Sequence, residues 1–444
     1  MNILIPWKII HLELSENIPA LEISCDYQGL YVVFWWQGIP VGDRVIPATD
    51  LPIPATQLAN LIIEAITPAI GDRLITGFET SFSEHFANCS KSPPNFQDLI
   101  NLNRPLAKLT QRRSKSVETV EVSVVICTRD RPEQLAQCLG MLQTLSPQPQ
   151  EVIVVDNAPT TDEVRQLVSQ MPSVRYVLEP RPGLDIARNT GIAHSTGQII
   201  AFTDDDVVIH SNWIASLQNG FENPQVMAVT GLVLPAQLET ESQIIFEWGH
   251  GCFGWGYRRR TFDRQFFQET KHLGVPVWCI GAGANMAFRR EIFDLVGNFD
   301  ERLDAGASGC SGDSEMWYRI LAEGWMCHYE PAAVVFHYHR RELDSLKKQM
   351  YLYMRGHVVA LLVQFAKYRH WGNLSRLCWT LPKHYSKLLL GGLFKGYQLK
   401  HKTYVPEILG CLAGIQFYIV NANPDKTLRS TSNPKLPTQA NKNH

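Results

Sequence analysis

The chain has 444 residues, a formal net charge of −2 and 45% hydrophobic residues, so it can bury at least one large core. Its charge is nearly balanced and its basic runs are short and separate, which excludes a general attraction for nucleic acid. The ten cysteines include no CxxC pair, a pattern that favours a reducing compartment such as the cytoplasm over a disulfide-bonded scaffold.

The N-terminal stretch MNILIPWKIIHLELSENIP carries one lysine and early acidic residues, so it does not have the layout of a secretory signal. Strand-like alternation at 29–42 and apolar residues at helical spacing in 55–70 predict a small α+β accessory domain over residues 1–117. The polar, basic stretch 109–121 has no periodicity and predicts a linker.

Residues 118–345 have a different character. From Val122 onward, β-branched runs alternate with amphipathic helices, and this alternation predicts a mostly parallel α/β sheet covered on both faces. Ligands of such sheets bind beyond the carboxyl ends of the strands. Three polar clusters follow predicted strands at such ends: Thr128 and Arg129, Asp156 and Asn157, and Asp204 to Asp206.

The region 346–422 is helical in pattern, and its apolar stretches alternate with Lys and Arg. Its longest apolar run, 408–420, is shorter than the ~20 residues that cross a bilayer and includes Gln416. We therefore expect a buried or interfacial helix that makes peripheral contact with the inner face of a membrane. A helical bracket packed on the α/β domain is the alternative. The polar tail 423–444 is expected to be disordered.

Three adjacent carboxylates, Asp204, Asp205 and Asp206, repel one another, so their ionised form needs a cation or solvent. The first strand of the sheet ends without a glycine-rich turn for phosphates, and the later GAGANM (281–286) lacks the third glycine of a dinucleotide fingerprint. A diphosphate ligand would then need another source of positive charge. Asp204 and Asp206 offer hard oxygen ligands for Mg²⁺ or Mn²⁺, which would supply it. A solvated turn is the alternative for the isolated cluster.

Five spaced motifs occur in the order in which glycosyltransferase family 2 has them, and the chain resembles that family over residues 120–345. The motifs are VSVVICTRDRPEQLAQCL, VIVVDNAP, GLDIARNTGIAHSTGQIIAFTDDDV, GAGANMAFRREIFDLVGNFDERL and GDSEMWYRI. The resemblance implies the GT-A type of Rossmann-like sheet, transfer of a hexosyl group from a nucleotide sugar, and a bound divalent metal, Mg²⁺ or Mn²⁺.

By the same resemblance, six residues are expected to contact the nucleotide sugar: Thr128, Arg129, Asp156, Arg188, Asp204 and Asp205. The ends of the family's DxD motif, Asp204 and Asp206, are the expected metal ligands together with His337. The acceptor side is expected to comprise three residues, Gly283, Asn285 and Glu315. The insert 232–280 is expected to tune the choice of acceptor.

Several of these residues have a structural alternative. Asp156 could cap the turn that follows it, and Arg188 could be an ordinary surface residue of a helix. His337 and His339 share one strand face, so either could be the metal ligand or could simply be packed.

Asp313 occupies the place of the family's catalytic base, in a GDSEMW segment where the family pattern is GEDxEL. Gly312 stands where the family has glutamate and Met316 where it has leucine, while the aspartate and Arg319 are kept. Asp313 could instead cap the helix that begins there, and the two roles are compatible.

These features predict an inverting transfer in which Asp313 deprotonates an acceptor hydroxyl that attacks the sugar of a nucleotide-diphosphate donor, a UDP-sugar. The acceptor is expected to be a carbohydrate or lipid-linked, in polysaccharide or glycoconjugate synthesis. Two alternatives stay open. DDDVVI also fits the DxDx(T/V) pattern of haloacid dehalogenase phosphatases, although three predicted strands precede it here and that pattern belongs on a first strand. The other is a catalytically silent sugar-nucleotide-binding module, against which Asp206 and Asp313 weigh.

Overall fold

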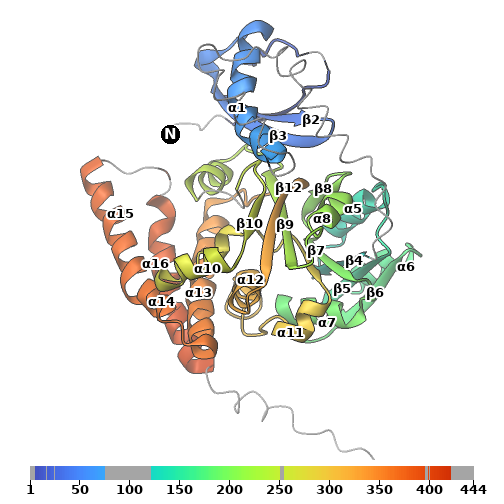
Figure 1. Ribbon diagram of the computed structural model, residues 1–444, viewed down its shortest axis with the longest axis vertical. Helices are drawn as coiled ribbons and strands as arrows, with labels where there is room; N and C mark the ends of the chain where they lie inside the picture. The colour runs from blue at the N-terminus through green and yellow to red at the C-terminus, as the bar shows by residue number, and fades with distance from the viewer. Residues whose placement is uncertain are drawn as a thin grey trace, which may run out of the picture.

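The computed structural model describes residues 6–75 (except 17 and 25), 122–250, 255–395, 399 and 401–421. The predicted linker 109–121 and the tail 423–444 lie outside the described residues. Figure 1 shows three parts: an N-terminal sheet with its helix at the top, a central sheet covered by helices, and C-terminal helices along the left side.

The central sheet has nine strands in the order β10-β12-β9-β11-β7-β4-β5-β6, with β8 paired to β12. One half is parallel and contains β4 (Val122–Thr128), β5 (Glu151–Asn157), β6 (Val174–Glu179) and β7 (Ile199–Asp204). The other half contains two parallel strands, β9 (Val226–Pro235) and β12 (Met326–His337), and three strands in antiparallel pairings, β8 (Val207–Ile209), β10 (Arg260–Phe262) and β11 (Asn285–Arg289). The predicted mostly parallel α/β architecture is confirmed.

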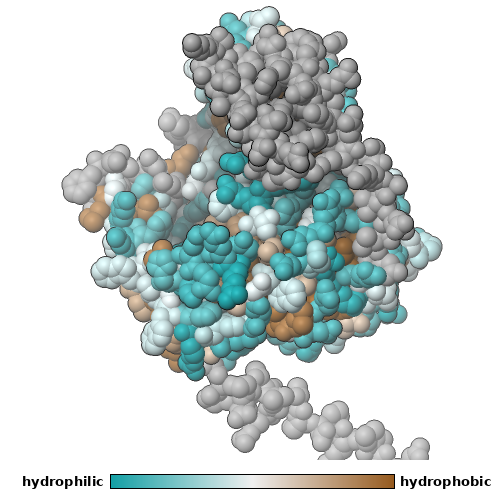
Figure 2. Space-filling view, in the orientation of Figure 1, coloured by the Kyte–Doolittle hydropathy of each residue, from teal (hydrophilic) through white to brown (hydrophobic). Residues whose placement is uncertain are grey.

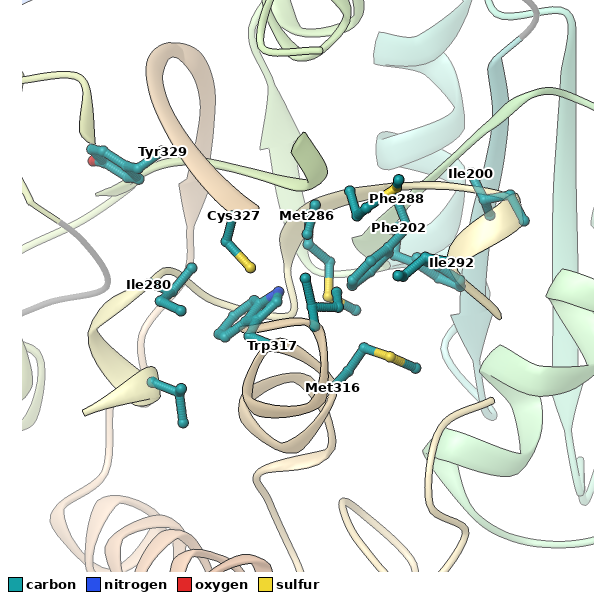
Figure 3. Close-up of a cluster of buried hydrophobic side chains, with 14 of the residues drawn as sticks. Ile200, Phe202, Ile280, Met286, Phe288, Ile292, Met316, Trp317, Cys327 and Tyr329 are labelled. Atoms are coloured by element: carbon teal, nitrogen blue, oxygen red, sulfur yellow. The ribbon is translucent and has the colours of Figure 1, made fainter. Parts of the chain in front are cut away.

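Helices cover both faces of this sheet: α5 (Pro132–Gln143), α6 (Glu163–Ser169), α7 (Leu184–His194), α8 (Trp213–Asn219), α11 (Glu291–Val296) and α12 (Gly312–Ala322). Because side chains alternate along a strand, Val124 of β4 packs with α5 and α8, whereas Val125 packs with α7 and α12. Figure 3 shows the second of these cores, where Trp317 of α12 lies beneath Met286 and the neighbouring sheet residues. Burial on both faces explains the unbroken apolar runs of the sequence.

The segment between β9 and β11 adds small elements to one end of the sheet. They are α9 (Glu241–Ile244), the π-helical turn η2 (Ile245–Gly249), α10 (Arg264–Thr270) and the 3₁₀ turns η3 (Lys271–Leu273) and η4 (Val277–Cys279). A capping box at Thr240 and Gln243 fixes the start of α9 and so the position of η2.

The N-terminal sheet consists of β1 (Trp7–Glu13), β2 (Gly29–Trp36) and β3 (Ile39–Pro47), followed by η1 (Ala48–Asp50) and α1 (Ala55–Ile75). The predicted strand pattern at 29–42 is a hairpin, because Gln37 and Gly38 both adopt positive φ angles, 47° and 73°, and turn the chain. Alternate residues of β2 serve two cores. Phe34 packs towards α1, while Val33 and Trp35 join the core of the central sheet.

The C-terminal region is helical, as predicted, with α13 (Leu343–Tyr368), α14 (Trp371–Ser375), the π-helical turn η5 (Arg376–Thr380), α15 (Leu381–Lys395) and α16 (His401–Asn421). α16 packs along α13 through glycines. Gly410 lies against the carbonyl of Tyr351 and Gly414 against that of Arg355, so closely that a Cβ at either position would clash.

The length of α16 corrects one expectation. The apolar run 408–420 is too short to cross a bilayer, but the helix begins at His401, contains Pro406 and has 21 residues. Among the described helices, α16 alone is long and apolar enough to cross a membrane by length and composition. The uninterrupted apolar run is shorter than the helix, because the first turns of the helix contain both polar and apolar residues.

Asn285, the first residue of β11, connects this strand to helix α8 and to strands β9 and β12. Its Oδ1 accepts a 2.8 Å hydrogen bond from Trp213 Nε1 of α8, and its Nδ2 donates to the carbonyls of Leu232 at 3.0 Å and Ala333 at 2.9 Å. The side chain is completely buried, and both amide protons are used inside the core. The side chain of Asn285 is therefore not available to an acceptor molecule, and the structure does not support its predicted acceptor-side role.

We expect Asn285→Ala to lower the free energy of unfolding by at least about 2 kcal/mol, because an indole N–H and two carbonyls would be left buried without partners. Denaturation by urea measures the change. Asn298→Ala, the same substitution at an exposed position, should change it by less than about 0.5 kcal/mol. Equal unfolding midpoints for the two variants would contradict a structural role of Asn285.

Candidate active site

The carboxyl ends of β4, β5 and β7 open into a cleft of about 640 Å³ that is bounded on its other side by the end of β12 and the first turns of α13. Six predicted site residues line it: Thr128, Arg129, Asp204, Asp205, Asp206 and His337. Four charged residues that no sequence motif singled out line it too: Arg131, Asp304, Arg340 and Lys348. Arg131 lies three residues after a predicted strand end, so the expectation that ligands bind beyond strand ends could have identified it. Asp304, Arg340 and Lys348 are brought to the cleft by the tertiary fold.

Asp204, Asp206 and His337 form a group suited to a cation. One ligand atom of each lies within 4.8 Å of the others, and His337 Nε2 is 3.7 Å from Asp206 Oδ1. Burial and the Asp206 carboxylate raise the pKa of Asp204 to about 7, while burial lowers the pKa of His337 to about 4, so the imidazole is neutral at pH 7. Two carboxylates and a neutral imidazole fit Mn²⁺ or Mg²⁺, whose charge would relieve the repulsion between the aspartates.

Hydrogen bonds behind His337 decide which of its ring nitrogens faces this group. His339 Nε2 lies 2.9 Å from Glu247 Oε2, and in the tautomer that donates only this proton to the carboxylate, Nδ1 of His339 is an acceptor. In that tautomer His337 Nδ1, 3.1 Å from His339 Nδ1, is the donor. The Nε2 atom of His337 that faces Asp206 then has no proton, as a metal ligand requires.

Glu247 belongs to the π-helical turn η2, and no sequence motif pointed to it. Single π-helical turns recur at functional sites because they displace one side chain from the regular helical positions. Glu247 also faces the N-terminal sheet: burial and this carboxylate raise the pKa of Asp43, in β3, to about 6. The N-terminal sheet thus borders the hydrogen-bonded chain that ends at the cation group.

Asp205, the middle aspartate, makes structural contacts. Its buried carboxylate accepts a 2.7 Å hydrogen bond from Thr128 Oγ1 and one of 3.1 Å from Arg131 Nη1. Arg131 also lies 3.4 Å from Asp206 Oδ2, so it offsets part of the negative charge of the cluster. Because Thr128 and Asp205 satisfy each other, their contacts to a nucleotide sugar stay predictions.

Arg188 is buried, which excludes the alternative of an ordinary surface residue. Its Nη1 donates to Asp185 Oδ1 at 2.9 Å and to Asp304 Oδ2 at 2.7 Å. Asp304 lines the cleft, and a Cβ placed on Gly283 would lie 2.6 Å from Arg188 Nη2. The guanidinium therefore spans the space between the cleft wall and Gly283.

Asp313 lies next to this guanidinium, in the first turn of α12. Its Oδ1 accepts a 2.6 Å hydrogen bond from the backbone N–H of Ser314, and a Cβ on Gly283 would lie 3.3 Å from its Oδ2. Burial and the Asp304 carboxylate raise the pKa of Asp313, which makes its ionised form a stronger proton acceptor. Position 283 therefore tolerates only glycine, because a side chain there would press on both Arg188 and Asp313.

The departure at position 312 has a steric reason. A Cβ on Gly312 would overlap the carboxylate of Asp185, whose Oδ2 lies against the start of α12. A glutamate, as in the family pattern, does not fit there without moving Asp185. The position of Asp185 in α7 therefore requires glycine at position 312 in α12.

Asp156, at the carboxyl end of β5, has one oxygen without a partner. Tyr176 donates its hydroxyl to Asp156 Oδ2 at 2.9 Å, while Oδ1 is buried and accepts no hydrogen bond from the described part of the chain. The expected alternative of a turn cap is therefore not observed. Burial raises the pKa of this carboxyl group. A buried acceptor without a donor at a strand end is suited to a ligand N–H group.

Glu315 is not brought to the cleft. It forms a buried 2.8 Å ion pair with Arg319, four residues on, and Arg319 donates to the carbonyls of Val296, Gly297 and Asn298. The pair lines a separate cavity of about 370 Å³ between α12 and α13. The ion pair fixes the turn after α11. The structure does not support the predicted acceptor-side role of Glu315.

The chain shows a clear relationship to known proteins. Residues 123–297 match the family model described as glycosyl transferase family 2. The succinoglycan biosynthesis protein ExoM of Rhizobium meliloti is 34% identical over 231 residues, which cover 49% of this chain and 67% of that protein. The chain belongs to glycosyltransferase family 2. The sheet described above has the α/β architecture expected for the GT-A fold of this family.

Other relatives match over a smaller share of their length. A glucosyl-dolichyl phosphate glucuronosyltransferase of Haloferax volcanii is 28% identical over 190 residues, 41% of this chain and 56% of that protein. A pre-mycofactocin glycosyltransferase of Mycobacterium tuberculosis is 28% identical over 226 residues, 50% of this chain and 44% of that protein. The chain thus spans about half the length of these two relatives.

A solved structure of a mannosyltransferase from Pyrobaculum calidifontis, in complex with GDP-Man and Mn²⁺, aligns with a TM-score of 0.46 at 17% identity, over 69% of this chain and 93% of that one. The structure does not support the alternative of a haloacid dehalogenase phosphatase. The three aspartates begin at the last residue of β7, which is the fourth strand of the central sheet along the chain and not the first.

We expect the affinity for Mn²⁺, measured by calorimetric titration in the presence of UDP, to rise with pH up to about 7 and then to level off. Below that pH, Asp204 holds a proton that the cation must displace, so each pH unit lowers the affinity by up to about tenfold. Asp206→Ala should remove most of the binding, whereas Glu133→Ala removes an exposed carboxylate outside the group and should not. An affinity that is constant across this range would exclude Asp204 as a ligand.

The hydrogen-bonded chain behind His337 generates another prediction. Glu247→Leu removes the acceptor that sets the tautomers of both histidines, so the affinity for Mn²⁺ should fall by about 10- to 100-fold. Glu247→Gln keeps an oxygen that can accept from His339 Nε2 and should lose much less. Circular dichroism checks that both variants are folded. Unchanged Mn²⁺ affinity in a folded leucine variant would show that Glu247 does not orient His337.

Proposed function

We propose that the chain is a metal-dependent, inverting hexosyltransferase that moves a sugar from a nucleotide-diphosphate donor, a UDP-sugar, to an acceptor hydroxyl. One observation supports the proposal: Asp204, Asp206 and His337 line the cleft as a cation-type group, while Asp313 lies behind the cleft wall beside Arg188, which pairs with the cleft-lining Asp304. Glycosyl transfer needs positive charge at the departing diphosphate and a base at the attacking hydroxyl. The arrangement provides for both.

The donor is proposed to bind along the carboxyl ends of β4 and β5. The partnerless Oδ1 of Asp156 would accept the ring N–H of a base such as uracil. Arg129, Arg340 and Lys348 line the cleft and would face the diphosphate. When bound by Asp204, Asp206 and His337, a divalent cation supplies positive charge that stabilises the leaving diphosphate.

The chemical step is a single displacement. Asp313 takes the proton of the acceptor hydroxyl as the hydroxyl oxygen bonds to the anomeric carbon. The bond from that carbon to the diphosphate oxygen breaks on the opposite face, and the nucleoside diphosphate leaves with the electron pair. The raised pKa of Asp313 supports its role as base, and its half-buried side chain supports access of an acceptor.

The acceptor is proposed to be a carbohydrate or a lipid-linked sugar, with a place in polysaccharide or glycoconjugate synthesis. The names of two relatives support this class: one is a succinoglycan biosynthesis protein and the other transfers to glucosyl-dolichyl phosphate. The segment 232–280 stays the proposed determinant of acceptor choice. Its Glu247 has the separate task of orienting the histidine pair.

Replacement of the base tests the proposal most directly. Asp313→Asn keeps the shape of the side chain and the hydrogen bond from the Ser314 N–H but cannot take a proton. Transfer should fall by about 10²-fold or more, as losses of a general base typically do. The affinities for Mn²⁺ and UDP should stay within a few-fold of the original, because Asp313 is not part of the cation group.

Glu315→Gln is the internal control, because Glu315 lies two residues away in a different cavity. It should lower stability without lowering transfer per folded molecule. Loss of transfer in folded Glu315→Gln, with transfer retained in Asp313→Asn, would show that the base is assigned to the wrong carboxylate. Binding of UDP-sugar without turnover to any acceptor, water included, would instead favour the silent binding module.

A further inference from the structure

The outward face of α16 is an apolar stripe. Six of its residues, between 37% and 69% exposed, follow one another at helical spacing: Val405, Leu409, Leu412, Ile415, Ile419 and Val420. From Val405 to Val420 the only polar exposed side chain of the helix is Gln416. Figure 2 shows scattered hydrophobic residues among more polar ones at the left edge of the molecule, in the region where Figure 1 places α15 and α16. A continuous exposed apolar stripe of this kind marks an interaction surface.

The opposite face of α16 is fixed to the protein. Gly410 and Gly414 bring its backbone against α13, and the buried Glu407 accepts a 2.9 Å hydrogen bond from the Tyr385 hydroxyl of α15. Phe417 and Tyr418 pack into a cluster with Leu303 of the central domain. To cross a bilayer, α16 would have to break these contacts and take Glu407 into hydrocarbon. The helix can lie on a membrane with its contacts intact.

The charges around the stripe fit an anionic surface. Residues 371–421 contain six Lys or Arg and one acidic residue, the buried Glu407; two of the six are engaged elsewhere, since Arg376 stacks on Trp278 and Lys402 pairs with Glu241. Lys383 and Lys387 are exposed and lie one turn apart on α15, the helix next to α16. An amphipathic helix with an apolar face and nearby lysines binds anionic lipid by burial of the apolar face and by attraction to the headgroups.

Exposed tryptophans add to the same picture. Trp371 of α14 and Trp379 of η5 are 73% and 69% exposed, although large aromatic side chains are usually buried. Tryptophan is enriched where one end of a side chain meets hydrocarbon and the other meets water. Leu389 and Leu390 of α15 are exposed as well.

We infer that the outer face of α16, with the lysines of α15 beside it, docks on an anionic lipid bilayer and lies in the plane of its surface. The occupant is a lipid surface and not a second copy of the chain, because the exposed lysines of the neighbouring helix α15 have no exposed acidic counterpart in residues 371–421. The inference does not depend on glycosyl transfer, so its failure and that of the proposed function are separable.

Flotation of the full chain with vesicles tests it. The chain should float with phosphatidylcholine vesicles that contain phosphatidylglycerol and not with phosphatidylcholine alone, and high salt should weaken the binding. Leu409→Asn, Leu412→Asn and Ile419→Asn together should weaken binding by about tenfold or more, since burial of the stripe is lost. Lys383→Gln with Lys387→Gln should weaken it on anionic vesicles.

A matched control removes exposed apolar side chains elsewhere. Met141→Asn, Leu178→Asn and Leu295→Asn together change three residues that are similarly exposed on the central domain and should leave flotation unchanged. Equal losses in the two triple variants would overturn the inference. So would binding that resists an alkaline wash, which indicates a spanning helix, or dimerisation through the stripe without flotation, seen by analytical ultracentrifugation.

Discussion

Repulsion between carboxylates is the constraint on which the cleft depends. Six aspartates surround it or its wall: Asp185, Asp204, Asp205, Asp206, Asp304 and Asp313. Two arginines, Arg131 and Arg188, form ion pairs at 2.7 to 3.4 Å with four of them, Asp205, Asp206, Asp185 and Asp304. Burial, followed by the neighbouring carboxylates, raises the pKa of Asp204 to about 7 and also raises the pKa of Asp313. A cation and a polyphosphate ligand with its own cationic partners would complete the balance.

The sequence predicted the parts of this site that follow from strand position. Thr128, Arg129 and Asp204 lie where the alternation of strands and helices placed them, because the carboxyl ends of parallel strands meet at one edge, whereas His337 was expected from the family resemblance. Asp304 and Lys348 could not be found this way, since they enter the cleft from a loop and a helix whose packing no local pattern encodes. Asn285 and Glu315 are polar residues in motif positions, but their side chains form hydrogen bonds within the core. Only the three-dimensional contacts reveal these bonds.

The N-terminal sheet looked like a separate accessory domain in the sequence, yet its second strand is shared between two cores. Trp35 stacks on His210 with ring centroids 5.0 Å apart, and its neighbour Val33 belongs to the core of the central sheet. The Asn212 side chain also donates to the Gly38 carbonyl at 3.2 Å. These contacts lie next to β8 and the end of β12. Asp206 directly precedes β8, and His337 is the last residue of β12. The N-terminal sheet therefore supports the backbone that holds the cation group.

Helix α13 faces both the cleft and α16. Lys348 and Tyr353 line the cleft, while the carbonyls of Tyr351 and Arg355 receive the glycines of α16. An α-helix with its side chains is about 10–12 Å across, so two helix widths, roughly 20 Å, separate the cleft from the outer face of α16. With that face on a lipid surface, as proposed, α13 and α16 act as a spacer of fixed height. A membrane-anchored acceptor shorter than this spacer could not reach Asp313, so the packing of two helices would set a minimum length for the substrate.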